Sequence, residues 1–483
     1  MDYLNNTDKK LANNSAFYPL SSPTDALAAR LFLVDHATTS LDVQYYIYET
    51  DTIGKVFNAH LLMAAQRGVK VRILLDDLST SGKDDQWQKL ASHPNVELRL
   101  FNPNRFRTFF RNMALLFNVD TLGKRMHNKS LIADGSAAIV GGRNIGDDYY
   151  ASYATRLFLD YDILAIGKVV PDIYKAFDLY WNSEASVPSE DILGIDKNLA
   201  DDFSTENLKK EILTYNKSLS GKAVVNSDFN RKISQNKLIL TVAEKTEFYY
   251  DHPSKVYIDE RDTSTHITTQ INEELVEVQK ELIIISPYFI PSEKLMDTIR
   301  DERERGVNVI IITNSLASTD VFPVYSGYQD DIKPLIKMGV KLYELKPDSF
   351  KNALSSKKWA NPNYLSLHTK MIIFDDDRIG VGSANIDPRS SKLNTELFMI
   401  ITSEKLTKEK KLMLGQVINP ENFYRLSWGK YPKDFDNEIT RYGPIWHTLE
   451  DGKEKIYHAP PHAGIWKRLM TDIISFFPIR GYL

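Results

Sequence analysis

Two short segments, far apart in the chain, carry the same pattern of side chains that could do chemistry. Both follow the spacing H-x-K-x4-D-x6-G-[GS]-x-N. In chain order the defining residues are His127, Lys129, Asp134 and Asn144, then His368, Lys370, Asp375 and Asn385. Histidine can act as a nucleophile or as a general acid and base. Lysine and asparagine can offer positive charge and neutral donors to phosphate oxygens.

The spacing suits a phosphodiester site built from both copies. Alternate residues of a strand point to the same side, so His127 and Lys129 should project together, as should His368 and Lys370. The glycines before each asparagine allow a tight turn that returns the amide toward the pair. One histidine could then attack phosphorus while the other protonates the leaving oxygen. We expect no metal ion and no cofactor to be needed.

A second repeat indicates the elements that position these motifs. Arg67-Gly68-Val69 and Arg305-Gly306-Val307 each follow a helix-like segment and precede an apolar strand, and a further strand pattern precedes each helix. Strand, helix and strand with short links predict parallel strands covered by helices. We therefore expect an α/β protein of two pseudo-symmetric α/β/α halves, with the active site at their interface.

Composition changes between the two halves and sets the expected boundaries. Residues 186–262 are rich in Asn, Lys, Ser and Asp, with weak helical periodicity. We expect a first half over 1–185, a variable connection or insertion over 186–262, and a second half over 263–483. A connection of this length is usually functional or disordered, and the sequence leaves both open.

The overall composition excludes several classes of function. The chain of 483 residues has no cysteine, which excludes disulfides, thiol nucleophiles, Cys-ligated zinc and iron–sulfur clusters. Its net charge of −4 argues against a strongly basic nucleic-acid-binding protein. Residues 1–16 lack the apolar stretch of a signal peptide, and no run reaches the ~18–20 apolar residues of a membrane span.

The doubled motif resembles the phospholipase D superfamily, in which two such motifs meet across a pseudo-twofold interface. Further segments are similar to bacterial cardiolipin synthases of the C type, from about Tyr18 to the carboxy terminus and most weakly over 186–262. These segments are Leu41–Tyr46, Arg125–Ser130, Gly141–Asp147 and Leu342–Pro347. Tyr325 departs from this pattern, because a histidine is expected near it in that subfamily. If that histidine belongs to the acceptor site, Tyr325 would alter the acceptor pocket.

The resemblance implies a ping-pong mechanism through a covalent phosphohistidine. A phosphatidyl group moves to one histidine, and an alcohol or water then takes it. Transfer to phosphatidylglycerol gives cardiolipin, whereas transfer to water gives phosphatidic acid. The resemblance assigns His127 as nucleophile and His368 as general acid and then base.

The resemblance also implies that a carboxylate outside the motif orients each histidine, as aspartate does in a hydrolase triad. The family pattern pairs Glu396 with His127 and Asp160 with His368. Asp134 and Asp375, which complete the two motifs, are then expected to bind backbone N–H groups near the glycine turns.

Two segments could bring a phospholipid substrate from a membrane surface. Residues 101–125 interleave Arg with Phe and Leu, which suits either a loop at a lipid interface or a core helix. An apolar stripe from Trp466 to Phe477 at helical spacing suits a peripheral membrane contact or a helix packed on the second half. We expect a peripheral protein of a bacterial membrane; its face and any small partner protein stay open.

Three alternative functions remain at this level. Hydrolysis of phospholipids to phosphatidic acid would use the same residues as transfer. An HKD nuclease or other phosphodiesterase is disfavoured by the acidic balance and by the Phe-rich approach to His127, so we expect no nucleic-acid partner. A non-catalytic scaffold is disfavoured because neither motif has lost a residue.

Overall fold

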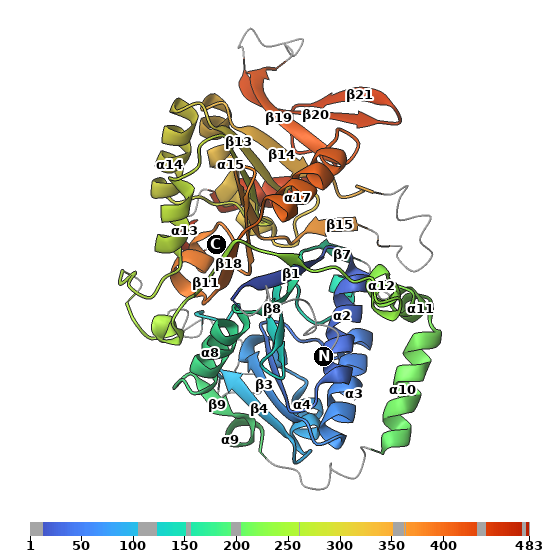
Figure 1. Ribbon diagram of the computed structural model, residues 1–483. Coiled ribbons are helices and arrows are strands. Elements are labelled where there is room, and N and C mark those ends of the chain that lie inside the picture. Colours follow the sequence, from blue (N-terminus) through green and yellow to red (C-terminus); the bar gives the residue numbers. More distant parts are fainter. Residues whose placement is uncertain are drawn as a thin grey trace.

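The computed structural model describes residues 13–104, 123–150, 156–194, 204–259, 261–350, 362, 364–431, 441–475 and 480–482. Two halves lie one above the other, with the amino-terminal half in blue to cyan below the second half in yellow to red (Figure 1). Each half has its own large mixed β-sheet. The expected α/β architecture of two related halves is therefore present.

The first sheet has nine strands among the described residues, in the spatial order β10-β1-β8-β6-β5-β2-β3-β4-β9. Their bounds are β1 (Ser15–Leu20), β2 (Ser40–Tyr45), β3 (Lys70–Asp76), β4 (Val96–Phe101), β5 (Ser130–Ala133), β6 (Ala137–Gly141), β8 (Asp162–Gly167), β9 (Ser186–Pro188) and β10 (Thr241–Val242). Strands β2, β3 and β4 are parallel. The other neighbours are antiparallel.

The second sheet has ten strands in the part of the chain that is described, in the order β11-β18-β17-β16-β12-β13-β14-β19-β20-β21. Their bounds are β11 (Lys245–Tyr250), β12 (Glu281–Ile285), β13 (Asn308–Asn314), β14 (Lys341–Leu345), β16 (Met371–Phe374), β17 (Arg378–Gly382), β18 (Leu397–Thr402), β19 (Phe423–Lys430), β20 (Tyr442–Glu450) and β21 (Lys453–Tyr457). Strands β12, β13 and β14 are parallel. The predicted parallel pairs are thus confirmed, but each motif strand (β5, β16) joins its sheet antiparallel to the first of them.

Helices cover both sheets. Their bounds are α2 (Pro23–His36), α3 (Thr52–Gln66), α4 (Asp84–Ala91), α7 (Asp147–Tyr150), α8 (Val170–Trp181), α9 (Ser189–Leu193), α10 (Thr205–Lys217), α11 (Leu219–Val225), α12 (Asp228–Ser234), α13 (Thr268–Leu275), α14 (Glu293–Glu304), α15 (Phe322–Lys337), α17 (Glu404–Val417) and α18 (Ile465–Ser475). Four single turns are η2 (Asp77–Thr80), η4 (Pro253–Val256), the π-helix η5 (Arg389–Leu393) and η6 (Arg480–Tyr482). Among the helices described, none combines the length and the apolar character needed to cross a membrane.

Local signals explain the ends of the helices that lead into the parallel strands. The side chain of Asp51 caps α3 by accepting the N–H of Gly54 at 3.1 Å. Gly68 follows α3 at a φ of +96°, a left-handed conformation that favours glycine. Ser292 caps α14 in the same way as Asp51 caps α3, and Gly306 ends it at a φ of +88°.

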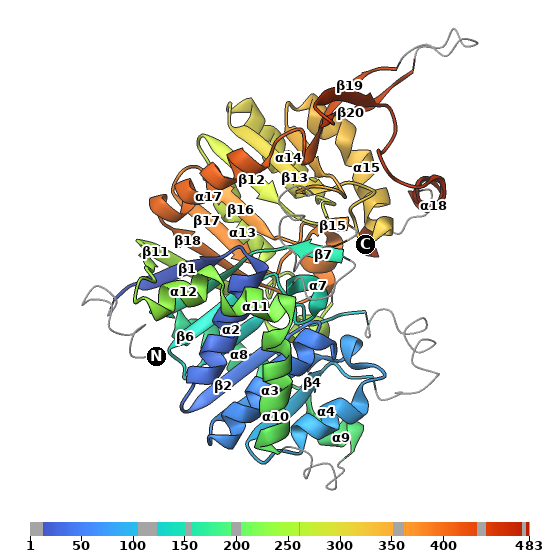
Figure 2. The same cartoon turned by 90° about the vertical axis from the view of Figure 1, so that its right-hand side faces the viewer.

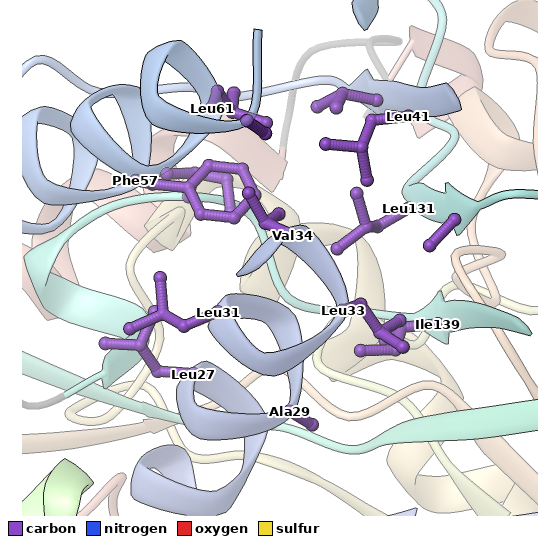
Figure 3. Close-up of a cluster of buried hydrophobic side chains, with 14 of the residues drawn as sticks. Leu27, Ala29, Leu31, Leu33, Val34, Leu41, Phe57, Leu61, Leu131 and Ile139 are labelled. Atoms are coloured by element: carbon purple, nitrogen blue, oxygen red, sulfur yellow. The ribbon is translucent and has the colours of Figure 1, made fainter. Parts of the chain in front are cut away.

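Three apolar cores hold the layers together. The first lies between helices α2 and α3 and the first sheet, and Figure 3 shows side chains of both helices meeting those of β2, β5 and β6. The second lies between the two halves and combines α8 and the first sheet with the second sheet and α17. The third packs α13, α14 and α15 on the outer face of the second sheet. The halves therefore share one continuous core, which fixes the two motifs relative to each other.

The connecting residues enter both sheets. Strand β10 extends the first sheet by pairing with β1, and β11 extends the second by pairing with β18. Before them, α10 packs along α3, while α11 and α12 pack on α2 (Figure 1). Residues 204–250 of the expected variable connection thus form ordered secondary structure that joins the two sheets at their edges.

Candidate active site

Each motif segment crosses to the opposite half. The N–H of His127 donates to the carbonyl oxygen of Thr395 at 2.9 Å, and the N–H of His368 donates to that of Leu159 at 2.8 Å. Strands β7 (Arg156–Leu159) and β15 (Tyr364–Leu367) form a separate parallel pair between the halves. His127 and His368 therefore precede β5 and β16 rather than lying inside them, and their N–H groups bond to carbonyl oxygens of the other half.

A polar side chain at the end of a parallel strand holds each motif segment. Asp76, at the end of β3, accepts the N–H of Met126 at 2.9 Å. Asn314, at the end of β13, accepts the N–H of Leu367 at 2.8 Å and donates to its carbonyl oxygen at 2.9 Å. Carboxyl ends of parallel strands are where such sites form in α/β folds.

The two histidines pair with carboxylates across the interface. Nδ1 of His127 lies 2.9 Å from Glu396, and Nδ1 of His368 lies 2.5 Å from Asp160. An ionised carboxylate only accepts, so each Nδ1 carries a proton and each Nε2 keeps its lone pair. The structure thus brings together all four residues in the crosswise pairs that the family pattern implies.

Two lysines lie beside these pairs in the protein interior. Lys129 and Lys370 are each 1% exposed, and their ammonium groups donate to the carbonyl oxygens of His127 and His368. Burial lowers the pKa of both lysines, that of Lys370 to about 8, while Asp160 and Glu396 act in the opposite direction. An anionic phosphate beside them would favour the ammonium form of both lysines, which would then offer positive charge to its oxygens.

Burial and like charges govern the protonation of the catalytic pairs. The pKa of His127 is held well below its usual range by burial and then by Lys129 and Lys370. The pKa of His368 is lowered by burial and then by Lys370, Lys129 and His127. Burial raises the pKa of Glu396 to about 6 and also raises that of Asp160. An anionic substrate would offset the cation crowding and stabilise an imidazolium.

The two asparagines differ in how their side chains are used. Asn144 accepts the N–H of Ile47 at 3.1 Å and donates to the Tyr149 hydroxyl at 2.7 Å. The amide oxygen of Asn385 is buried and has no hydrogen-bond partner among the described residues. Only the second asparagine therefore keeps an amide oxygen available inside the site.

The motif aspartates lie at the far ends of the motif strands and bind backbone. Asp134 accepts the N–H groups of Thr39 at 2.7 Å and Ser40 at 3.0 Å. Asp375 accepts those of Lys280 at 2.6 Å and Glu281 at 3.0 Å. These N–H groups belong to the residues that enter β2 and β12, and not to the glycine turns, so the aspartates join neighbouring strands.

Several side chains that no sequence motif singles out surround the two His–carboxylate pairs. The Ser383 and Ser390 hydroxyls donate to Glu396, at 2.5 and 2.6 Å. Aromatic rings flank the imidazoles: Tyr46 lies 4.9 Å from His127 between ring centroids, and Phe158 lies 5.0 Å from His368. Ser383 occupies the variable G-[GS] position of the motif, and this was the one feature of the sequence that could have indicated a serine in the site. The aromatic residues carry no spacing that distinguishes them from core residues.

A cavity of about 980 Å³ adjoins the second half-site. Asn385 and Asp387 line it on the side of the motif loop, and Ile271 and Leu295 line it from α13 and α14. Burial raises the pKa of Asp387 to about 7. The cavity therefore combines an apolar helix side with the polar loop that carries Asn385.

Tyr325, the residue that departs from the subfamily pattern, lies inside the second half. It is buried in the core on the outer face of the second sheet, and its hydroxyl donates to Glu344 at 3.1 Å. Glu344 also accepts the indole N–H of Trp446 at 2.8 Å. A buried hydroxyl needs such a partner, so Tyr325 has a structural role here, and its effect on an acceptor pocket stays a prediction.

The two predicted lipid contacts have different outcomes. Residues 105–122 of the Arg- and Phe-rich segment lie outside the described residues. In α18 the apolar stripe faces away from the protein: Ile465 is 82% exposed and Trp466 77%. Thr471 is buried on the opposite side, where α18 contacts α15 at the edge of the molecule (Figure 2).

No group of three or more His, Asp or Glu side chains that could hold a metal ion occurs in the described part of the chain. Besides Lys129 and Lys370, the charge of Arg389 acts on His127 and that of Arg143 acts on His368. The positive charge around the two histidines therefore comes from lysine and arginine side chains.

Known proteins resemble both halves of the chain. Residues 32–161 and 271–414 match the model of a family described as "Cardiolipin synthase, PLD-like domain". Cardiolipin synthase C of Escherichia coli (strain K12) is 35% identical over 473 residues, covering 96% of this chain and 96% of that protein. Cardiolipin synthase B of the same strain is 25% identical over 399 residues, covering 81% and 75%.

A solved structure shows the same architecture. The phosphatidylserine synthase of Haemophilus influenzae Rd KW20 aligns with a TM-score of 0.57 at 14% identity, covering 84% of this chain and 88% of that one. At this identity the likeness concerns the fold alone. The two ranges that match the family model contain both motifs and both partner carboxylates.

Proposed function

The chain belongs to the family of PLD-like cardiolipin synthases within the phospholipase D superfamily, and on that premise we propose that it is a phosphatidyltransferase acting on glycerophospholipids. The reaction that we favour makes cardiolipin from phosphatidylglycerol and a second phospholipid. The observation that carries the proposal is the crossed arrangement in which each histidine is oriented by a carboxylate of the other half.

In the first step, Nε2 of His127 attacks phosphorus while its Nδ1–H stays bonded to Glu396. The bond from phosphorus to the headgroup oxygen breaks as the nitrogen–phosphorus bond forms. His368, as an imidazolium held by Asp160, gives its proton to the leaving oxygen. Binding of the anionic phosphodiester is what favours this imidazolium in a site crowded with cations.

In the second step, neutral His368 takes the proton from the hydroxyl of the acceptor, whose oxygen attacks phosphorus. The nitrogen–phosphorus bond breaks, and His127 is released unchanged. Lys129 and Lys370 contact the non-bridging oxygens throughout, and the free amide oxygen of Asn385 could accept a hydrogen bond from a hydroxyl. Transfer requires an oriented acceptor, because water is present at about 55 M and only a positioned alcohol outcompetes it.

The exposed face of α18 supports peripheral association with a bilayer. Leu469, Met470 and Ile473 continue the exposed apolar surface begun by Ile465 and Trp466. Lys467, on the inner side, donates to the carbonyl oxygen of Thr319 at 3.2 Å, next to Asp320. The charge of Asp320 reaches Lys370 and Tyr149, so α18 lies beside a loop that borders the catalytic pocket. A helix in this place would hold the pocket close to its lipid substrate.

Lipid mass spectrometry tests the reaction. The protein is incubated with phosphatidylglycerol and phosphatidylethanolamine vesicles, separately and mixed. Cardiolipin is the expected product wherever phosphatidylglycerol is present. Phosphatidic acid as the sole product would show that the protein hydrolyses phospholipids and does not transfer phosphatidyl groups. Cleavage of DNA with no phospholipid turnover would show that it is a nuclease.

Vesicle co-sedimentation tests the membrane contact. The double variant Ile465→Ser/Trp466→Ser should bind vesicles several-fold more weakly, because it removes two of the most exposed apolar side chains. Leu412→Ser, at an exposed leucine of α17, is the matched control and should bind like wild type. Equal binding by the double variant would remove α18 from the membrane contact.

A further inference from the structure

The segment that connects the two halves reaches the catalytic centre at Asp251. This residue directly follows β11 and is fully buried. Its N–H donates to the carbonyl oxygen of Glu396 at 3.0 Å, and the N–H of Glu396 donates to its carboxylate at 2.9 Å. Asp251 therefore holds the backbone of Glu396 from both sides.

Lys255, one turn further on in η4, links two of the partners of Glu396. Its ammonium group donates to Asp251 at 2.9 Å and to the carbonyl oxygen of Ser390 at 2.9 Å. The hydroxyl of Ser390 in turn donates to Glu396. One ammonium group thus fixes both the residue that clamps the backbone of Glu396 and a hydroxyl that binds its carboxylate.

The surroundings of Asp251 leave it a single orientation. Its second carboxylate oxygen accepts the N–H of Ile267 at 2.8 Å, and its carbonyl oxygen accepts the Tyr180 hydroxyl at 2.6 Å. The side chains of Asp251 and Lys255 are both 0% exposed. A buried ion pair of this kind contributes little net stability compared with apolar packing. Its main effect is therefore to fix the orientation of the groups that it contacts.

In the first half, a different side chain holds the backbone of the partner carboxylate Asp160. There β1 pairs with β8 as β11 pairs with β18. Arg143 lies next to the end of β1 and donates to the carbonyl oxygens of Leu20 and Asp160. The second half has Ala384 at the position of Arg143 in the motif, so the clamp there comes from the connecting segment instead.

We propose that Asp251 and Lys255 are positioning residues that hold Glu396 and thereby set the orientation and protonation of His127, but not of His368. The inference rests on the proposed function, in which ionised Glu396 orients the attacking histidine. Neither residue touches the substrate, and their effect reaches the reaction only through Glu396.

Loss of the Lys255 charge should raise the pKa of Glu396. Lys255 lowers the pKa of Glu396, which burial raises to about 6. The titratable groups that act on Glu396 or respond to its charge are Lys129, Lys255, Lys370, Asp251, Asp387, His127, Tyr46 and Tyr180. Without Lys255, Glu396 would stay protonated to a higher pH. The acid side of the activity profile should then move to higher pH.

The experiment compares Lys255→Met with Lys410→Met. Lys410 is another buried lysine, on α17, where its ammonium group lies 4.4 Å from the centroid of the Tyr161 ring and burial lowers its pKa to about 7. With a soluble short-chain phospholipid, Lys255→Met should lower kcat roughly 10- to 100-fold at unchanged KM. The pH at which its activity falls on the acid side should increase by about one unit. Lys410→Met should leave the acid limb unchanged.

A second readout does not depend on turnover. In protein with ¹⁵N-labelled histidines, Lys255→Met should change the nitrogen shifts and titration of His127 and leave those of His368 as in wild type. The double variant Asp251→Asn/Lys255→Met leaves no lone buried charge, but it removes both charges of the ion pair, so their opposite effects on the pKa of Glu396 largely cancel. If Lys255→Met folds poorly, this variant should still change the nitrogen shifts of His127, because the carbonyl oxygen of Ser390 loses its ammonium donor.

The possible outcomes separate the two proposals. Unchanged nitrogen shifts of His127 in both variants together with an unchanged acid limb in Lys255→Met, or the same shifts in Lys410→Met, would overturn the positioning role. A wild-type protein that turns over no phosphodiester would overturn the proposed function, while the shift of His127 in Lys255→Met would still support the link through Glu396.

Discussion

The two half-sites share their histidine, lysine and asparagine but support their carboxylates differently. Asp160 meets His368 at 2.5 Å and accepts the N–H of Tyr161 at 2.8 Å. Glu396 meets His127 at 2.9 Å and also accepts two serine hydroxyls. The two halves therefore share the motif residues and differ in the residues that contact the partner carboxylates.

The difference suits two separate tasks. The hydroxyls around Glu396 stabilise its charge, which fixes the neutral tautomer of His127 that a nucleophile needs. Asp160 accepts fewer hydrogen bonds than Glu396, so its negative charge interacts more strongly with His368. This interaction suits His368, because His368 must become an imidazolium in the proposed mechanism. Pseudo-symmetry of the fold is compatible with this division, because the supporting residues come from different elements in each half.

Loss of either histidine should have the largest effect. His127→Ala and His368→Ala should each lower phospholipid turnover by about 10⁴-fold or more, because neither histidine can complete both steps alone. Intact-protein mass spectrometry of His368→Ala, given a phosphatidyl ester with a nitrophenol leaving group, should show a phosphatidyl adduct on His127. An adduct on any other residue would reverse or reject the division of roles.

Removal of one carboxylate charge should have the next largest effect. Asp160→Asn and Glu396→Gln should each lower turnover of natural phospholipid by about 10²–10⁴-fold. A nitrophenol leaving group needs no proton, so pre-steady-state release of nitrophenol should recover in Asp160→Asn and stay slow in Glu396→Gln. Equal recovery in the two variants would remove the functional distinction between the half-sites.

A pair of substitutions behind the carboxylates should have smaller and unequal effects. Gly142 and Ser383 occupy equivalent motif positions, but a Cβ at Gly142 would lie 2.2 Å from the Asp160 carboxylate. Gly142→Ala should therefore displace Asp160 and cost roughly 100-fold in kcat. Ser383→Ala should cost only about tenfold, because one hydrogen bond to Glu396 is lost.

The pH profile of Ser383→Ala sharpens the comparison. Burial raises the pKa of Glu396 to about 6, and the Ser383 hydroxyl acts to lower it. In the proposed mechanism, ionised Glu396 is the active form. Activity of the wild type should fall as the pH drops through about 6, and in Ser383→Ala it should begin to fall at a higher pH. Rates measured across the acid range with a short-chain substrate check this, and an unshifted limb would count against ionised Glu396.

Chelation should have the smallest effect on turnover. In the proposed mechanism, Lys129 and Lys370 provide positive charge for the phosphate oxygens in both half-sites. With detergent-dispersed substrate, which removes effects at the lipid interface, EDTA should change kcat by less than about twofold. Complete loss of activity that Mg²⁺ restores would show that the lysines are not sufficient.

The duplication and the two copies of the motif could be predicted from local patterns in the sequence. The repeated spacing around His127 and His368 and the repeated helix-Gly-strand segments are local patterns, because strand and helix periodicity depend on neighbouring residues. The parallel strands β2 and β3, and β12 and β13, follow from those patterns. The carboxylates Asp160 and Glu396 came from family resemblance, since nothing in their spacing distinguishes them.

The residues that hold the partner carboxylates in place could not be predicted from local patterns, because tertiary packing brings them there. Asp251 and Lys255 lie in a segment without any motif, and they reach Glu396 because β11 pairs with β18 at the edge of the second sheet. The exposure of the apolar face of α18 likewise depends on how the helix packs against α15, because an apolar stripe suits a core as well as an exposed surface. Such contacts join residues far apart in the chain, and their partners are set by packing rather than by local sequence.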